Sequence, residues 1–273
     1  MKTFFLLCAF VSFLFLSGCK KSYPVNDMTA IEKIKAIKNM ARISPLSIYD
    51  YLTNQASGIL YISNHGGYLN QQCTDPRIAA YFRKNTIDNV LPSTIDNIGL
   101  DSLGTLGYKM NSGQKPDLIA LFGHTAKINL HYKAGSEFIS KFKLPVTEIL
   151  SLPEQNISNI YTGKTITWNS SNQNEDVQNK YVLISLSYDP TNNSNQVFAA
   201  NGFNTKIYSN IILDDNGAYE FSNSDLEKFP PKGVLNLEIY KGNFITPQDQ
   251  NSEKNFFIGS YSMISFSTIL ENP

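Results

Sequence analysis

The feature of the sequence that most constrains the fold is the alternation of apolar and polar residues with a period of two. Successive side chains of a β-strand point to opposite faces, so this pattern predicts strands that pack one face against a core. Four segments carry it most clearly: 126–133, 181–188, 235–240 and 256–269. Together they predict a mainly β fold for the C-terminal part of the chain.

Short turn-forming sequences lie between these segments. They are Asp189-Pro190, Asn201-Gly202, Asp215-Asn216-Gly217 and Lys241-Gly242-Asn243. Strands separated by connections of differing length are typical of an antiparallel β-sandwich, which we expect over residues 116–273. One helical turn, capped by Ser224 or Asp225, is expected at residues 223–228.

Three expected strands resemble those of the immunoglobulin-like β-sandwich modules found in secreted bacterial proteins. They are Ile166–Asn169, Tyr181–Tyr188 and Phe256–Ile269. The resemblance implies an immunoglobulin-like arrangement, although the paired core cysteines of antibody-type domains are missing. Trp168 shares a strand face with Ile166 if this segment is extended, and we expect its large apolar side chain in the core.

The N-terminal part, residues 29–115, is predicted to mix helix and loop. Thr29 and Glu32 fit a capping box at the start of a helix. Apolar residues at helical spacing continue this helix over residues 29–42, and Pro45 ends the pattern. This helix could lie on a membrane surface or pack on the globular part.

Further along, residues 58–63 predict a strand. Residues 75–84 predict one or two turns of helix, because Asp75 fits a cap and a proline follows it. Residues 85–115 are rich in Gly, Asn and Asp and are expected to form loops with short elements. We expect a domain boundary near residues 111–117.

The chain begins like a secretory signal peptide. A single basic residue, Lys2, precedes an apolar run at residues 4–16. This run is shorter than the roughly 20 residues that a membrane-spanning helix needs. We therefore expect residues 1–18 to be a removable signal peptide.

The apolar run ends in Leu16-Ser17-Gly18-Cys19, which resembles the lipobox of bacterial lipoproteins. The resemblance implies cleavage before Cys19, a diacylglyceryl group on its thiol, and acylation such as palmitate on the new amino group. Two or three acyl chains hold a protein on a membrane stably. Residues 19–28 then form a lipidated tether, whose Lys20 and Lys21 are suited to anionic head groups.

The same resemblance predicts where the protein lives and what it binds there. A residue other than Asp after the lipidated Cys19 favours the outer membrane, and no acidic cluster follows it. We therefore expect a lipid-anchored protein of the cell envelope that faces the periplasm. Its first partner is membrane lipid.

Composition narrows the functional classes further. The chain has 23 basic and 23 acidic residues, and this balance gives no support for nucleic-acid binding. Of the three cysteines, Cys8 lies in the signal peptide and Cys19 in the lipobox, so only Cys73 remains as a free thiol. No intramolecular disulfide is expected, and stability must come from packing.

Candidate catalytic groups are few. His65 and Cys73 are near each other in sequence and could form a thiol or zinc site, although no third ligand is marked. His124 and His131 are seven residues apart, so on one strand they face opposite sides and do not share a metal. We predict no metal and no cofactor, with Cys73 as a structural thiol.

Three other motifs have simpler interpretations. Ser112–Lys115 matches the S-x-x-K pattern of serine penicillin-recognising enzymes, but Gly113 and the following proline oppose a helix, so a linker is expected. Asp214–Gly217 resembles the start of a calcium loop, but a hairpin turn is simpler. Exposed tyrosines could stack on sugars; the candidates are Tyr181, Tyr208, Tyr219 and Tyr240.

These observations favour a non-catalytic binding or scaffolding module at the cell envelope, with a carbohydrate or protein ligand. The alternative is an envelope hydrolase with a carboxylate-based site in the N-terminal region, because a pair of catalytic carboxylates requires no local sequence motif.

Overall fold

The computed structural model describes residues 44–45, 48, 56–67, 73–82, 90–102, 108–132, 137–147, 159–170, 179–249 and 254–271. The predicted signal peptide, the lipobox-like segment, the predicted tether and the predicted helix at 29–42 lie outside these residues. In the described part no helix is long and apolar enough to cross a bilayer.

The described residues are mainly in β-strands. In the first half of the chain the elements are β1 (Gly58–Gly67), β2 (Cys73–Phe82), β3 (Val90–Ile95), β4 (Ile98–Ser102), β5 (Tyr108–Met110), η3 (Ser112–Gln114), α5 (Lys115–Leu121), β6 (Thr125–Tyr132) and β7 (Glu137–Lys143). In the second half they are β8 (Asn159–Ile160), β9 (Thr165–Thr167), β10 (Lys180–Tyr188), η4 (Asn193–Asn195), α6 (Gln196–Ala200), β11 (Ile207–Leu213), β12 (Ala218–Glu220), α7 (Asn223–Leu226), β13 (Val234–Ile245), β14 (Gln248–Asp249) and β15 (Lys254–Leu270).

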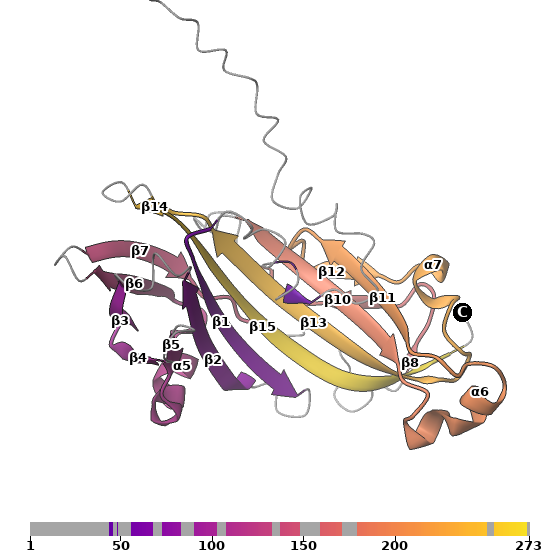
Figure 1. Ribbon diagram of the computed structural model, residues 1–273. Coiled ribbons are helices and arrows are strands. Elements are labelled where there is room, and N and C mark those ends of the chain that lie inside the picture. The colour runs from indigo at the N-terminus through magenta and orange to yellow at the C-terminus, as the bar shows by residue number, and fades with distance from the viewer. Residues whose placement is uncertain are drawn as a thin grey trace, which may run out of the picture.

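Within the described residues, 13 strands join in one twisted sheet (Figure 1). Its main path runs β11-β10-β13-β15-β1-β2-β5-β4-β3-β6-β7. The sheet is mixed, because β15 pairs in parallel with β1 and with β8, whereas the other pairs are antiparallel. A second, two-stranded sheet consists of β9 and β12. The predicted mainly β fold is confirmed, but the sheet is not purely antiparallel.

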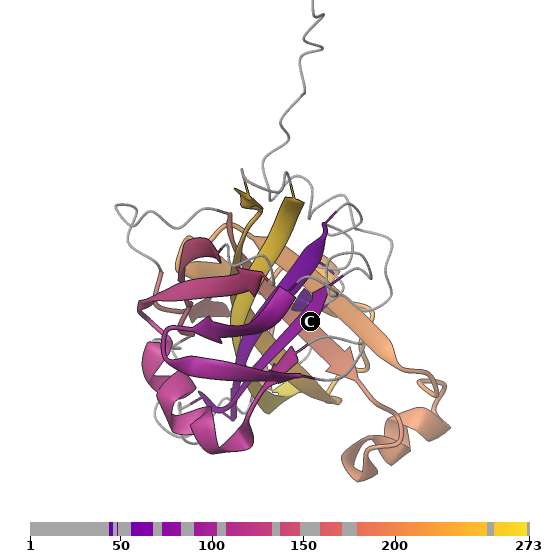
Figure 2. The same cartoon turned by 60° about the vertical axis from the view of Figure 1, so that its left-hand side comes forward.

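One face of the large sheet, the inner face, packs against two hydrophobic clusters. The first lies where β6, β7 and α5 pack against β1, β2 and the start of β15, and it contains Ile62, Ile128 and Phe256. The second lies where β9, β12 and α7 cover β10, β13 and the end of β15. Trp168 and Ile166 are both buried in it, as predicted. Figure 2 shows α5 and α6 lying apart at two ends of the molecule.

The opposite, outer face is buried only in part. A third cluster covers β10, β13 and the start of β15, where Ile48 packs among Tyr181, Phe244 and Phe257. Ile48 is fully buried, so a segment N-terminal to β1 lies against this part of the sheet. On β1, Ile59 and Tyr61 pack at the border of this third cluster, and polar and charged residues of β1 and β2 continue the outer face beyond them, as described below.

A buried polar seam runs between the two inner-face clusters. Lys241, 5% exposed, extends from β13, and its Nζ lies 3.3 Å from a carboxylate oxygen of Asp215. Lys241 also donates a hydrogen bond to the carbonyl of Asn169, and Trp168 donates its indole N–H to Asp215 over 2.8 Å. Thr147 hydrogen-bonds Ser262 nearby. This seam satisfies polar backbone groups of the segments that cross the inner face.

The described residues of the four alternating segments all lie in strands, namely β6, β10, β13 and β15. The strand predicted at 58–63 is confirmed within β1, and the helical turn predicted at 223–228 is confirmed as α7. Its cap is Ser222, however, and Asp225 closes the capping box from the third helical position. Neither residue that we expected at the cap occupies it.

The structure contradicts further local predictions. Residues 75–82 do not form a helix but belong to strand β2, which pairs with β1 over its length. Lys241-Gly242-Asn243 is not a turn but lies inside β13, where Gly242 is opposite Tyr181 of β10. The predicted boundary near 111–117 falls on η3 and α5, and strands from both sides of it belong to the same sheet.

Gly242 leaves space that the Tyr181 ring fills, and this contact makes a testable prediction. A Cβ atom on Gly242 would overlap the ring, with Cε1 2.6 Å away. We expect Gly242→Ala to lower the free energy of unfolding by about 1–3 kcal/mol, because the buried ring must shift. Gly99→Ala is the matched control, since no atom lies within 4 Å of its added Cβ. Equal thermal denaturation of the two variants would contradict this.

Candidate functional site

The candidate site lies on the outer face of β1 and β2, where charged and aromatic side chains gather. We define the β1–β2 surface as Tyr61 and His65 of β1, with Asp75, Arg77 and Tyr81 of β2. The intervening residues Ile62, Ile78 and Ala80 point the other way, into the first inner-face cluster. The polar residues therefore face outward because the strands bury their alternate positions.

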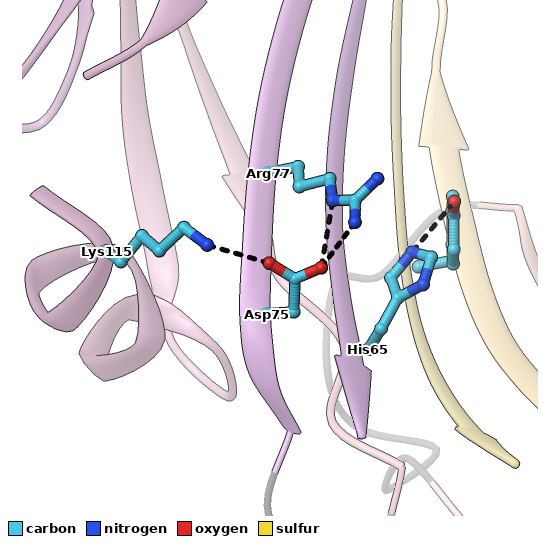
Figure 3. A network of polar contacts seen from close by, with 5 residues as sticks. His65, Asp75, Arg77 and Lys115 are labelled. Carbon is cyan, nitrogen blue, oxygen red and sulfur yellow. Dashed lines mark hydrogen bonds and ion pairs between the residues drawn. The ribbon is translucent and has the colours of Figure 1, made fainter. Parts of the chain in front are cut away.

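Asp75 is the centre of a charged contact between β2 and α5 (Figure 3). Its Oδ2 accepts hydrogen bonds from Nε and Nη2 of Arg77, at 3.0 and 2.5 Å, and its Oδ1 accepts one from Nζ of Lys115 at 2.9 Å. The ammonium of Lys115 and then the guanidinium of Arg77 hold the pKa of Asp75 below its usual range. All three side chains reach solvent, so these ion pairs add little to stability.

His65 and Tyr261 of β15 form the neighbouring polar contact. Nε2 of His65 lies 3.2 Å from the hydroxyl oxygen of Tyr261, and the ring centroids are 5.5 Å apart. Burial lowers the pKa of His65, and the nearby Arg77 guanidinium lowers it further. The imidazole is therefore mainly neutral at pH 7. Burial raises the pKa of Tyr261, which keeps its hydroxyl protonated.

Polar side chains continue from Tyr261 onto β13. The rings of Tyr240 and Tyr261 lie 5.8 Å apart, and the Tyr240 hydroxyl donates to a carboxylate oxygen of Glu238 at 2.7 Å. Asn236 donates to the same carboxylate at 3.2 Å and accepts a hydrogen bond from Ser265. The outer face thus presents a chain of linked polar groups across neighbouring strands.

The aromatic part of the β1–β2 surface lies at the other end of β2. Tyr81 is 43% exposed, and its ring centroid is 6.2 Å from that of Tyr61. Arg77 is four positions away on the same strand, about 13 Å along it. Tyrosine rings offer a stacking surface, and arginine offers several hydrogen-bond donors in one plane. Such a pair can hold an extended ligand that is both flat and polar.

Of the residues that the sequence suggested for thiol or metal chemistry, His65 and Cys73 come to neighbouring positions on adjacent strands. His65 lies on the candidate surface, and Cys73 begins β2 opposite Gly66, the residue after His65. His124 is exposed before β6, and His131 contacts Glu137 with 3.1 Å between Nδ1 and Oε1. No group of three metal-ligating side chains occurs in the part of the chain that the structure describes.

The other motifs also have definite positions. Ser112–Lys115 is not a linker, because η3 and α5 make it helical; a proline fits the first turn of α5. The side chain of Lys115 forms an ion pair with Asp75. Asp214–Gly217 is not the hairpin turn that we expected, because it joins β11 of the large sheet to β12 of the two-stranded sheet. Asp215 faces inward to Lys241.

The four tyrosines proposed for sugar stacking are not the exposed ones. Tyr181 and Tyr240 are buried, while Tyr208 and Tyr219 are half-buried. Tyr81 is the exposed tyrosine on the β1–β2 surface, and it is not among these four candidates. The sequence of β2 does have a period of two that could have indicated this surface. The polar positions of Asp75 and Arg77 alternate with apolar positions such as Ile78.

Comparison with known proteins does not assign the chain to a family. No protein-family model matches the chain, and no curated protein or solved structure is significantly similar to it.

Proposed function

We propose that this protein is a non-catalytic binding module of the cell envelope, anchored by lipid at Cys19 and binding a ligand on the β1–β2 surface. The observation that carries the proposal is the contrast between the two faces of β1 and β2. Their inner face is packed in a hydrophobic cluster, while their outer face groups an exposed tyrosine with Arg77, Asp75 and His65. Tyrosine and arginine, together with tryptophan, are enriched at the hot spots of protein interfaces.

The proposed anchor is supported by the lipobox resemblance of Leu16-Ser17-Gly18-Cys19 and by the apolar run before it. We place the lipid-anchored protein in the outer membrane, facing the periplasm, because the residue after Cys19 is lysine. Membrane lipid is then one partner, and the ligand of the β1–β2 surface is the other.

The ligand is proposed to be a carbohydrate or a protein segment. Both can present a flat surface to Tyr81 and hydrogen-bond acceptors to Arg77, whose Nε and Nη2 contact Asp75 and whose Nη1 points away from it (Figure 3). The immunoglobulin-like arrangement of the C-terminal strands stays a prediction. These strands do not form a separate sheet, because the sheet continues from β13 and β15 into β1 and β2.

The alternative is a hydrolase with paired carboxylates in the N-terminal region. A glycosidase-type general acid needs a raised pKa, so that it is protonated at neutral pH. Asp75 has a lowered pKa because Lys115 and Arg77 hold it as the carboxylate. Its environment therefore favours a binding role over an acid catalyst.

Binding of the mature protein to arrays of oligosaccharides and envelope-derived peptides tests the proposal. We expect Arg77→Ala and Tyr81→Ala each to weaken the binding of any recognised probe by about tenfold or more. Lys127→Ala is the control, because Lys127 is exposed on β6, away from this surface. Unchanged binding by both surface variants, or cleavage of a bound oligosaccharide detected by mass spectrometry, would contradict it.

A further inference from the structure

We propose that the ligand of the β1–β2 surface is an acidic oligosaccharide, and that Arg77 binds its carboxylate together with Lys109 of the neighbouring strand β5. This inference rests on the proposed function, because it names the class of ligand that the same surface binds. It also adds Lys109, which lies beside the β1–β2 surface as defined above, and makes this residue a determinant of specificity for charge.

Ala79 lies at the centre of this part of the outer face. The strand register places it directly opposite Tyr61 of β1 and directly opposite Lys109 of β5. Arg77 and Tyr81 are its neighbours on the same face of β2, each about 7 Å away along the strand. Ala79 is half-buried and has only a methyl group, so it leaves room between the four longer side chains around it.

Lys109 faces the same side of the sheet as Ala79. Its neighbour Met110 is buried in the first inner-face cluster, so the side chain of Lys109 points outward, where it is exposed. Asp101 of β4 is opposite Lys109. Within the part of the chain that the structure describes, however, the ammonium of Lys109 forms no ion pair and no hydrogen bond. It can therefore donate to a ligand.

The charges around Ala79 favour an anionic ligand. The carboxylate of Asp75 is shared by two cations, Arg77 and Lys115, and the side chain of Arg77 remains 67% exposed (Figure 3). Arg77 and Lys109 are diagonal neighbours across β2 and β5, about 7–8 Å apart, which long side chains can bridge. A ligand carboxylate between them would accept charge-assisted hydrogen bonds from both.

The aromatic rings and the backbone favour a sugar over a peptide. Tyr81 is 43% exposed and its ring centroid lies 6.2 Å from that of Tyr61, so a ligand beside Ala79 contacts tyrosine rings as well as cations. Strand β2 is paired on both sides at Ala79, with β1 and with β5, so it offers no edge here to which a peptide could add as a further strand. A sugar ring with a carboxylate matches the site, because its apolar C–H face packs on an aromatic ring while its charge meets the cations.

Calorimetric titration of the mature protein in detergent tests this inference. The probes are oligosaccharides of galacturonic, glucuronic and mannuronic acid, the methyl ester of each, and a peptide of glutamic acid residues. We expect at least one acidic oligosaccharide to bind about tenfold or more tightly than its ester, because esterification removes the charge and keeps the ring. Lys109→Gln should weaken binding of that acidic form by about tenfold and leave binding of the ester almost unchanged, whereas Lys109→Arg should keep the preference. Lys141→Gln, at an exposed position of β7, is the matched control and should not change binding.

A second variant, Ala79→Leu, tests the position of the ligand without removing a charge. Because leucine fills the room between the tyrosines and the cations, we expect it to weaken binding of the acidic oligosaccharide by about tenfold. Equal affinity for the acidic and esterified forms, tighter binding of the glutamate peptide, or no binding of any acidic oligosaccharide would overturn the inference. An effect of Lys109→Gln no larger than that of Lys141→Gln would also overturn it. The proposed function still stands in these cases if Arg77→Ala and Tyr81→Ala weaken binding of another probe, and it fails as well if they weaken none.

Discussion

Replacing Trp168 with alanine is expected to lower the free energy of unfolding by about 3–5 kcal/mol. The indole is 2% exposed and packs in the second inner-face cluster beneath β9 and β12. Its removal deletes a large apolar group and also the N–H that Asp215 accepts at 2.8 Å. Such a loss is a large share of the roughly 5–15 kcal/mol that stabilises a typical domain.

Urea denaturation followed by circular dichroism measures this effect. Trp168→Phe is the control, because it keeps an aromatic side chain in the cluster and loses mainly the hydrogen bond to Asp215, so its effect should be smaller. As the chain has a single tryptophan, the fluorescence of the unsubstituted protein should be blue-shifted and move red on unfolding. A native spectrum typical of exposed indole, with unchanged stability of Trp168→Ala, would contradict the buried position.

Replacing Lys241 with methionine is expected to cost about 3–5 kcal/mol. Methionine fills much of the same volume, so the main change is the loss of the ammonium that faces Asp215 inside the protein. The side chains of these two residues are 6% and 2% exposed. Removing one member of a buried ion pair leaves the other charge in a medium of low polarity, which costs far more than losing a surface pair.

Two comparisons make this result specific to the buried pair. Lys127→Met changes the same residue type at an exposed position of β6 and should leave the denaturation midpoint almost unchanged. Combining Lys241→Met with Asp215→Asn removes both charges and should recover part of the lost stability. A Lys241→Met variant as stable as Lys127→Met would show that the pair is not buried in solution.

The strands that bury one face could be predicted from the sequence, because burial imposes a local period of two. The segments within β6, β10, β13 and β15 carry that period. The parallel pairing of β1 with β15 could not be predicted in the same way, since it joins residues about 200 positions apart and leaves no local trace. The outer-face contact between Gly242 and Tyr181 is similarly long-range, and it makes a turn-like sequence part of a strand.

The candidate site was missed for a related reason. An Asp-Pro pair at the start of β2 is a helix-start signal, and it outweighed the alternation that places Asp75 and Arg77 on one face. Lys115 reaches Asp75 only because α5 packs beside β2, and Tyr261 reaches His65 only across the parallel pair. Each of these contacts depends on tertiary structure, whereas the lipobox resemblance depends only on the order of residues along the chain.

The central claim, that this is a lipid-anchored envelope protein, is tested most directly by mass spectrometry of its mature N-terminus. The full chain is expressed in a bacterium, the protein is purified from the membranes and digested, and the N-terminal peptide is identified. We predict a peptide that begins at Cys19 and carries a diacylglyceryl group on the thiol, and no such peptide from the Cys19→Ala variant. A mature N-terminus elsewhere in the chain, or a Cys19 thiol without lipid in membrane-derived protein, would contradict the account.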